Sequence, residues 1–328
     1  MKQLLSIPLS SRTPLDYPDL EAACRRAGCD GIEGMWCGEA LPFVPESVRC
    51  GYHLAYFPEW LSFWREDREA LRREFGTDQT WQGFYGGDRR ERLLDYYEQD
   101  MRRAAALDAE YMVFHVADVS TCEHFTYQWR RSHEEVIDAA AEVLNLVLPK
   151  VRPTATLLVE NQWLPGFTFT EPRLTARLLD AIHWSNKGIM LDIGHLMNCN
   201  PDLITEAEGA KYVQRMLDAH GSLCEYIKGI HLHQSLSGSY VAQHVGPDKL
   251  PKDWPEDYYL RYSRACRHVM ELDQHRPWHS TAIRRVLERL EPAYIVHELR
   301  NSSPREYLQL IHTQQSAAGL RRSAAVKY

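Results

Sequence analysis

Carboxylate and imidazole side chains recur in this sequence at the ends of short apolar runs. The residues are His53, His115, Glu160, Asp192, His195, His231, His233 and Glu298. One such group in an apolar run could be a hydrogen-bonded core residue, because burying it unpaired costs several kcal/mol. A series of them indicates a shared site. Carboxylate and imidazole ligands without thiolate bind Mn²⁺, Zn²⁺, Co²⁺ or Mg²⁺. The sequence therefore predicts a divalent metal site, with manganese or zinc the foremost candidates.

Eight strand-length segments supply these ends. They are residues 3–8, 31–36, 49–56, 111–117, 155–161, 188–193, 226–234 and 293–299. Most are continuously apolar rather than alternating, which is typical of parallel strands covered on both faces.

Amphipathic segments separate the strands and predict helices. They are residues 17–27, 88–107, 132–151, 171–182, 206–223, 257–273, 280–290 and 303–315. Ser132 with Glu135, and Ser303 followed by Pro304, are typical helix starts. Strands alternating with helices predict a (β/α)₈ TIM barrel over residues 1–316, with the site at the carboxyl ends of the strands. An open doubly wound sheet is less favoured, because no glycine-rich phosphate loop is present.

Two connections are longer than a barrel needs. Residues 57–87, after the third strand, are rich in aromatic side chains and predict either a lid over the substrate or a satellite hydrophobic cluster. Residues 235–256 follow the seventh strand. Residues 317–328 are expected to form a C-terminal tail without a site.

Composition excludes several classes of protein. The 328 residues are 44% hydrophobic and 25% charged, as in ordinary globular proteins and unlike disordered or coiled-coil chains. No apolar run is long enough for a membrane helix or a signal peptide, so we expect a cytoplasmic protein. The eight cysteines form no C-x-x-C pair and are expected to be reduced and structural. The net charge of −7 argues against a nucleic-acid partner.

Three of the strand ends resemble motifs of the xylose isomerase-like barrels, which include sugar isomerases and epimerases, sugar-acid dehydratases and endonuclease IV. Residues 226–232 (YIKGIHL) and 158–161 (LVEN) resemble strand motifs of endonuclease IV. Residues 191–195 (LDIGH) match the D-x-x-H shared across the superfamily. The resemblance extends from about His53 to Glu298.

The resemblance implies specific ligands. Glu160, Asp192, His231 and Glu298 would surround the metal common to the epimerases. His53 and His115, with Glu160 bridging, would hold a second metal as in the endonuclease. His195 and His244 would lie at the place of a third. There the family's D-x-H reads Ala242-Gln243-His244, so the carboxylate is expected to be missing.

The leading expectation is a metal-dependent isomerase or epimerase acting on a small polyol carbonyl compound, such as a sugar. The metal would stabilise an enediolate while Glu160 and Glu298 exchange the proton and His195 polarises a substrate oxygen. Residues expected to line the pocket are Glu33, Trp36, Tyr56 and His233. For Glu33 and Trp36 a polar rim residue and a packing tryptophan are equally plausible. The arginine that ketose epimerases place after the strand-seven histidine is absent from residues 234–238, so the substrate is expected to differ from a plain ketohexose.

Two alternatives remain open. One is a hydrolase or lyase of the endonuclease IV type that cleaves a phosphoester with two metals. The other is a non-catalytic ligand-binding barrel, or a partner subunit that docks another protein. The number of bound metals separates these functions. Exposed aromatic side chains in residues 57–87 would favour a homo-oligomer.

Overall fold

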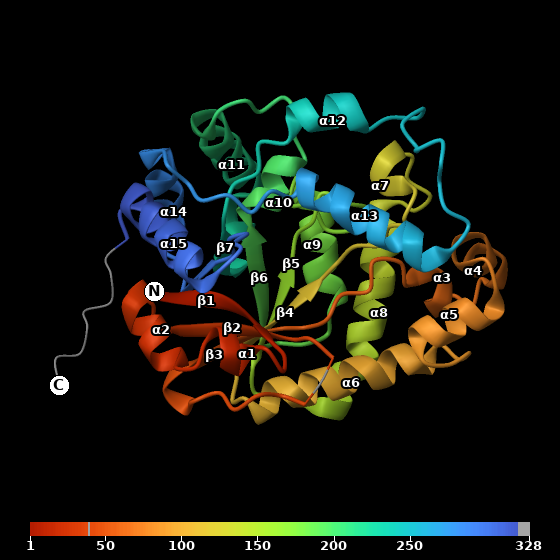
Figure 1. Ribbon diagram of the computed structural model, residues 1–328, viewed down its shortest axis with the longest axis horizontal. Coiled ribbons are helices and arrows are strands. Elements are labelled where there is room, and N and C mark those ends of the chain that lie inside the picture. Colours follow the sequence, from red (N-terminus) through yellow and green to blue (C-terminus); the bar gives the residue numbers. More distant parts are fainter. Residues whose placement is uncertain (39, 321–328) are drawn as a thin grey trace.

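Eight parallel strands close into a barrel in strict sequence order in the computed structural model, which describes residues 1–38 and 40–320 (Figure 1). The strands are β1 (Lys2–Leu9), β2 (Gly31–Trp36), β3 (Arg49–His53), β4 (Tyr111–His115), β5 (Thr156–Glu160), β6 (Lys187–Asp192), β7 (Ile227–Leu232) and β8 (Tyr294–His297). The predicted (β/α)₈ TIM barrel is confirmed. Strand β3 ends at His53 rather than at the predicted residue 56.

Side chains two residues before the strand-end carboxylates and imidazoles form an apolar cluster with one another. Val113, Leu158, Met190 and Val296 belong to this cluster, together with Leu4, Cys50 and Tyr111. Because side chains two apart on a strand share a face, His115, Glu160, Asp192 and Glu298 extend the face that carries the cluster. The apolar cluster thus forms a floor for the polar side chains at the strand ends.

Helices connect the strands and cover them. The longer helices are α2 (Leu20–Ala27), α6 (Glu91–Ala106), α8 (His133–Val151), α9 (Pro172–Ala181), α11 (Glu206–His220), α13 (Tyr258–Leu272), α14 (Arg284–Leu290) and α15 (Pro304–Ala318). Further helices are α1 (Thr13–Asp16), α7 (Glu123–Thr126), α10 (Ile193–Asn198) and α12 (Gly238–His244). Short 3₁₀ segments are η1 (Glu46–Val48), η2 (Gly221–Tyr226) and η3 (Thr281–Ile283). Ser132 and Glu135 form the predicted capping box of α8.

The insertion after β3 is helical rather than a plain loop. It forms α3 (Leu61–Trp64), α4 (Arg68–Phe75) and α5 (Asp78–Tyr85). Its aromatic side chains pack inward, since Trp60, Phe63, Trp64, Trp81 and Tyr85 are buried in the main hydrophobic core. They are therefore not the exposed aromatic surface on which the expectation of a homo-oligomer rested.

Hydrogen bonds tie this insertion to the segment that follows β4. Asp118 Oδ1 accepts from the backbone N–H groups of Trp60 and Leu61, each at 2.8 Å. The indole of Trp60 donates to the carbonyl of Ala117, at 2.8 Å. Glu74 accepts from both the backbone and the hydroxyl of Thr121, at 2.9 and 2.7 Å. The insertion is thereby fixed against the barrel rim.

The end of the chain departs from the expected tail. Helix α15 continues to Ala318, and Ala317 and Ala318 are buried. Residues 321–328 of the expected tail lie outside the described residues. Within the described ranges, no helix is both long and apolar enough to cross a membrane. All eight cysteines are free thiols.

Candidate metal centre

Parallel register brings the predicted ligands together at one end of the barrel. His115 of β4 is paired with Glu160 of β5, and Asp192 of β6 is paired with His231 of β7. His53 is the last residue of β3, and Glu298 directly follows β8. The carboxyl ends of the strands therefore carry all six side chains on one rim, as expected for a site in this fold.

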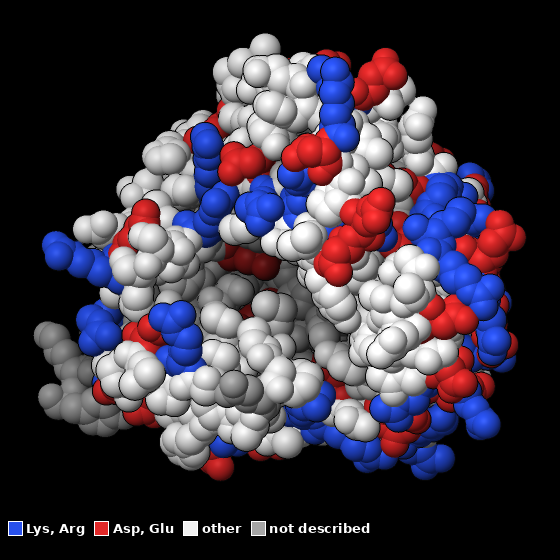
Figure 2. Space-filling view, turned by 45° about the vertical axis from the view of Figure 1, so that its right-hand side comes forward, with Lys and Arg blue, Asp and Glu red and all other residues white. Residues whose placement is uncertain are grey.

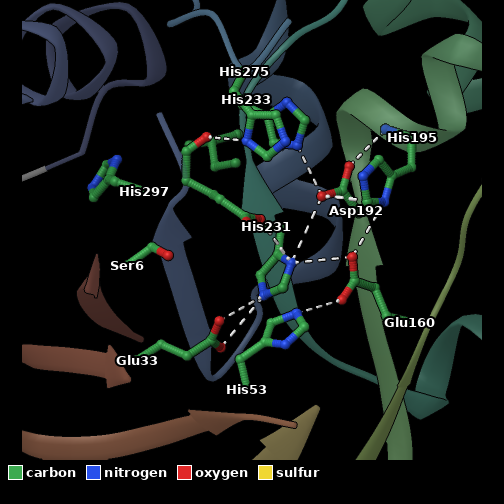
Figure 3. Close-up of polar contacts among 12 residues, drawn as sticks. Ser6, Glu33, His53, Glu160, Asp192, His195, His231, His233, His275 and His297 are labelled. Atoms are coloured by element: carbon green, nitrogen blue, oxygen red, sulfur yellow. Dashed lines mark hydrogen bonds and ion pairs between the residues drawn. The ribbon is translucent and has the colours of Figure 1, made fainter. Parts of the chain in front are cut away.

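Among the carboxylates of the site, Glu160 lies beside the largest number of histidine side chains (Figure 3). Its Oε2 lies 3.2 Å from His53 Nε2 and 2.9 Å from His115 Nε2. Its Oε1 lies 3.2 Å from His195 Nδ1 and 3.4 Å from His231 Nδ1. One carboxylate thus lies between two pairs of histidines, the geometry that a bridging ligand requires.

A second group surrounds Nδ1 of His231. Glu298 Oε2 lies 3.1 Å from this nitrogen, and Asp192 Oδ2 lies 3.6 Å from it. The D-x-x-H motif owes its spacing to helix α10, because Asp192 caps this helix by accepting from the backbone N–H of His195, at 2.6 Å. The side-chain amide of Asn161 fixes the backbone of Asp192. Its Oδ1 accepts from the backbone N–H of Asp192 at 2.8 Å, and its Nδ2 donates to the backbone carbonyl of Asp192 at 2.9 Å.

A third group forms around His195, and here the sequence-based expectation is corrected. His244 does not join it, because this residue lies exposed on α12, where its ring stacks on Tyr240 with centroids 4.3 Å apart. Instead Asp273 Oδ2 lies 3.1 Å from His195 Nε2 and 2.6 Å from His275 Nε2. The carboxylate that seemed to be missing is Asp273.

Sequence reasoning missed Asp273 and His275 because they follow a helix rather than a strand. They come directly after α13, beyond the inserted α12, whereas the D-x-H was expected at Ala242-Gln243-His244 in the loop after β7. A D-x-H is nevertheless present in the connection between β7 and β8, since residues 273–275 read Asp-Gln-His.

The four residues expected to line the pocket are placed differently from one another. Glu33 is buried beside the site, with Oε1 3.1 Å from His231 Nε2 and Oε2 accepting from the hydroxyl of Tyr111 at 2.7 Å. His233 lies 2.8 Å from Asp192 Oδ2, and its ring stacks on His275 with centroids 4.0 Å apart. Tyr56 borders the cavity described below.

Trp36 is the exception among these four residues. Its ring lies under the guanidinium of Arg103, 3.6 Å from the ring centroid, and beside Tyr96. These contacts are with helix α6, so the packing interpretation of Trp36 describes its position.

Charges within the site shift the pKa values of its members in opposite directions. Burial raises the pKa of Glu160, but the adjacent His115 and His231 outweigh burial and hold it well below the usual range. Burial lowers the pKa of His53, but the hydrogen bond and charge of Glu160 raise it to about 9. Burial likewise opposes ionisation of His275, and Asp273 raises its pKa to about 9. The carboxylates Glu160 and Asp273 therefore favour positively charged groups beside them.

The donor set fits divalent metal ions. The ligand atoms of His53, His115 and Glu160 lie within 4.8 Å of one another, as do those of Asp192, His231 and Glu298. The same holds for His195, His233, Asp273 and His275. Within the described part of the chain, the buried His115 Nδ1 and His233 Nδ1 have no hydrogen-bond partner. Nitrogen and oxygen donors of this kind suit Zn²⁺ or Mn²⁺.

A cavity of about 320 Å³ opens beside these groups. His115, His195, Asp273, His275 and Glu298, all candidate metal ligands, form one side of it, called the metal-ligating side below. Pro58, Glu59 and Glu74 of the insertion form another part of the wall, and one face of α13 forms a third. No lysine or arginine of the described residues borders it. Figure 2 shows a hollow in the surface with acidic side chains visible inside it.

Comparison with solved structures gives the same fold. Endonuclease IV from Thermus thermophilus is 14% identical, with 98% of this chain and 100% of that chain covered and a TM-score of 0.51. L-Ribulose 3-epimerase is 11% identical, with 96% and 93% covered and a TM-score of 0.54. At such identities the likeness establishes the fold alone.

No curated protein matches the sequence. A family model does match, described as the xylose isomerase-like TIM barrel, over residues 22–314. This span includes every strand-end ligand from His53 to Glu298 as well as Asp273 and His275. The chain belongs to the xylose isomerase-like TIM barrel family.

Proposed function

We propose that this protein is a metal-dependent hydrolase that cleaves a small phosphoester in the cavity beside the three ligand groups. The observation that carries the proposal is the adjacency of these groups. Glu160 is shared between His53 and His115 on one side and His195 and His231 on the other. A single-metal enzyme needs neither the His53–His115 pair nor the Asp273–His275 pair.

Each group has a role that its position supports. His53, His115 and Glu160 would hold one divalent ion; Asp192, His231 and Glu298, again with Glu160, a second; and His195, Asp273 and His275 a third. Ions held by these groups would supply an activated water and neutralise charge on a phosphoryl group. Glu33 would orient His231, and His233, which also lies with the third group, would orient Asp192.

The enclosure supports a small substrate rather than duplex DNA. A volume of about 320 Å³ lies in the range of pockets for small molecules. The insertion and α13 both contribute to the wall. A groove for DNA gains most of its affinity from lysine and arginine contacts to phosphates, and no such residue of the described chain borders this cavity.

A metal-dependent isomerase or epimerase of a sugar-like carbonyl compound is the second candidate, and a specific arrangement favours it. Glu160 Oε1 and Glu298 Oε2 lie 3.4 and 3.1 Å from the same nitrogen of His231. If an ion is bound beside His231, these two carboxylates would flank it and would be suited to remove and return a proton of the substrate. His195 would then polarise a substrate oxygen.

Substrate turnover separates the two candidates. Protein loaded with Zn²⁺ or Mn²⁺ should hydrolyse bis(4-nitrophenyl) phosphate, and chelation should abolish the activity. The same preparation should leave a panel of ketoses unchanged. Metal-dependent epimerisation of a ketose without phosphoester hydrolysis would overturn the hydrolase and support the isomerase or epimerase. Inertness of the metal-loaded protein toward both would contradict both candidates.

A further inference from the structure

One face of helix α13 runs along the cavity away from the metal-ligating side. Tyr258, Tyr262, Ala265 and Val269 border the cavity at successive turns of this helix, and Asp273 follows the helix at its end. At a rise of about 1.5 Å per residue, this face is on the order of 20 Å long. The cavity therefore extends from the metal ligands along a helix, rather than closing around them.

Most of the exposed wall along this extension is hydrocarbon, although Glu59, Glu74, Thr121, His124 and Gln162 also border the cavity. Val119 and Leu164 border it from the segments after β4 and β5, and both are buried. Ala265, Val269 and Met270 border it from α13. Beside these hydrocarbon side chains, the hydroxyl groups of a free sugar would lose bound water and gain few hydrogen-bond partners in return, which would weaken binding of the sugar. An apolar chain or ring would gain from the same burial.

Resting on the proposed function, we propose that the substrate has two parts. A polar head binds at the metal-ligating groups, and an apolar arm lies along α13 between Val119, Leu164 and Val269. The substrate class is thus a phosphate ester of a lipophilic alcohol, rather than a free sugar or a nucleic acid.

Binding of hydroxamic acids tests the apolar arm without relying on turnover. Hydroxamates chelate active-site metals, so acetohydroxamate reports the head site alone. Butyrohydroxamate and octanohydroxamate add methylenes that would enter the apolar arm. The dissociation constant, measured by titration calorimetry on metal-loaded protein, should fall on the order of threefold to fourfold for each methylene buried.

A pair of matched variants locates the arm. Val269→Thr replaces a half-buried methyl group on the cavity wall with a hydroxyl group. It should weaken octanohydroxamate several-fold and leave acetohydroxamate unchanged. Val151→Thr makes the same change to a half-buried valine at the end of α8, away from the cavity lining, and should change neither constant.

The outcomes separate this inference from the proposed function. Equal constants for acetohydroxamate and octanohydroxamate would overturn the apolar arm while leaving the metal centre intact. A gain with chain length that Val269→Thr does not reduce would also overturn it, because the arm would then lie elsewhere. Failure of metal-loaded protein to bind acetohydroxamate would overturn the metal centre itself.

Discussion

At the scale of single residues, the site depends on Glu160 more than on any other side chain. Its two oxygens lie within 3.4 Å of nitrogens from His53, His115, His195 and His231. It is buried, and the adjacent histidines keep its pKa well below the usual range. A neutral side chain of the same shape would therefore remove the charge that holds these histidines together.

Glu160→Gln should abolish turnover while only part of the metal is lost. The loss of rate should be on the order of a hundredfold or more, the scale on which removal of a catalytic charge acts. Asp192, His231 and Glu298 remain to hold an ion. The measurement is initial rate together with metal content. Glu225→Gln, on the exposed segment before β7, is the control. Turnover like that of the wild type would contradict the role of Glu160.

The third group gives a second prediction. His275→Ala should lower the number of bound ions by one, because it removes the imidazole that lies nearest to Asp273. His244→Ala removes an imidazole from exposed α12 and should leave the metal content unchanged. Metal analysis of both variants after loading and dialysis checks this. The opposite pattern would restore His244 as the ligand and contradict the assignment of Asp273 and His275.

The sequence predicted the residues that end strands and missed those that do not. Parallel strands converge at their carboxyl ends, so His115, Glu160 and Asp192 were expected to meet whatever the loops did. Asp273 reaches the site only because α13 crosses toward it, and no spacing rule fixes where a helix after an insertion ends. The sequence likewise left two alternatives open for Trp36, because its packing against Arg103 depends on the position of α6.

At the scale of elements, the insertion after β3 joins the cavity to a buried group of carboxylates. Glu59 is buried near Glu74 and Asp118, and its Oε2 has no hydrogen-bond partner within the described residues. Burial and these two neighbouring charges raise the pKa of Glu59 well above its usual value. Burial also raises the pKa of Asp118, to about 6.

This arrangement predicts a pH-dependent gain from Glu59→Gln. Between the usual and the raised pKa, folded protein retains a proton that the unfolded chain releases, so wild-type stability falls as pH rises through this window. Glutamine removes that loss. The unfolding free energy of the variant relative to wild type should therefore increase from about pH 5 to about pH 8, by about 1.4 kcal/mol for each unit of raised pKa.

Urea unfolding at the two pH values measures this difference. Glu69→Gln, on the exposed face of α4, removes a charge without touching the buried carboxylates and is the control. A difference that stays constant with pH, or that shrinks as pH rises, would contradict a raised pKa for Glu59.

The three helices of the insertion after β3 were not predicted from the sequence. Helices α3, α4 and α5 have only four, eight and eight residues, and helices this short owe their stability to packing rather than to propensity. The long helices behave differently. Helix α8 was predicted because its capping box and apolar face are both written in its own sequence.

At the scale of the whole molecule, the barrel and the site were predicted by the same feature. Apolar runs ending in a carboxylate or an imidazole imply parallel strands covered on both faces and also place ligands on one rim. The extent of the cavity was not predictable, because its walls come from the insertion, α13 and the strand ends together. The resulting chamber has candidate metal ligands at one end and mainly hydrocarbon along α13, which is consistent with the proposed chemistry on a small molecule.

The number of metal ions per chain tests the central claim most directly. Protein loaded with Zn²⁺ or Mn²⁺, dialysed and measured by inductively coupled plasma mass spectrometry against protein concentration, should contain three ions per chain, one at each of the three sites proposed above. A single ion per chain, or none, would contradict the multinuclear centre on which the proposed hydrolysis depends.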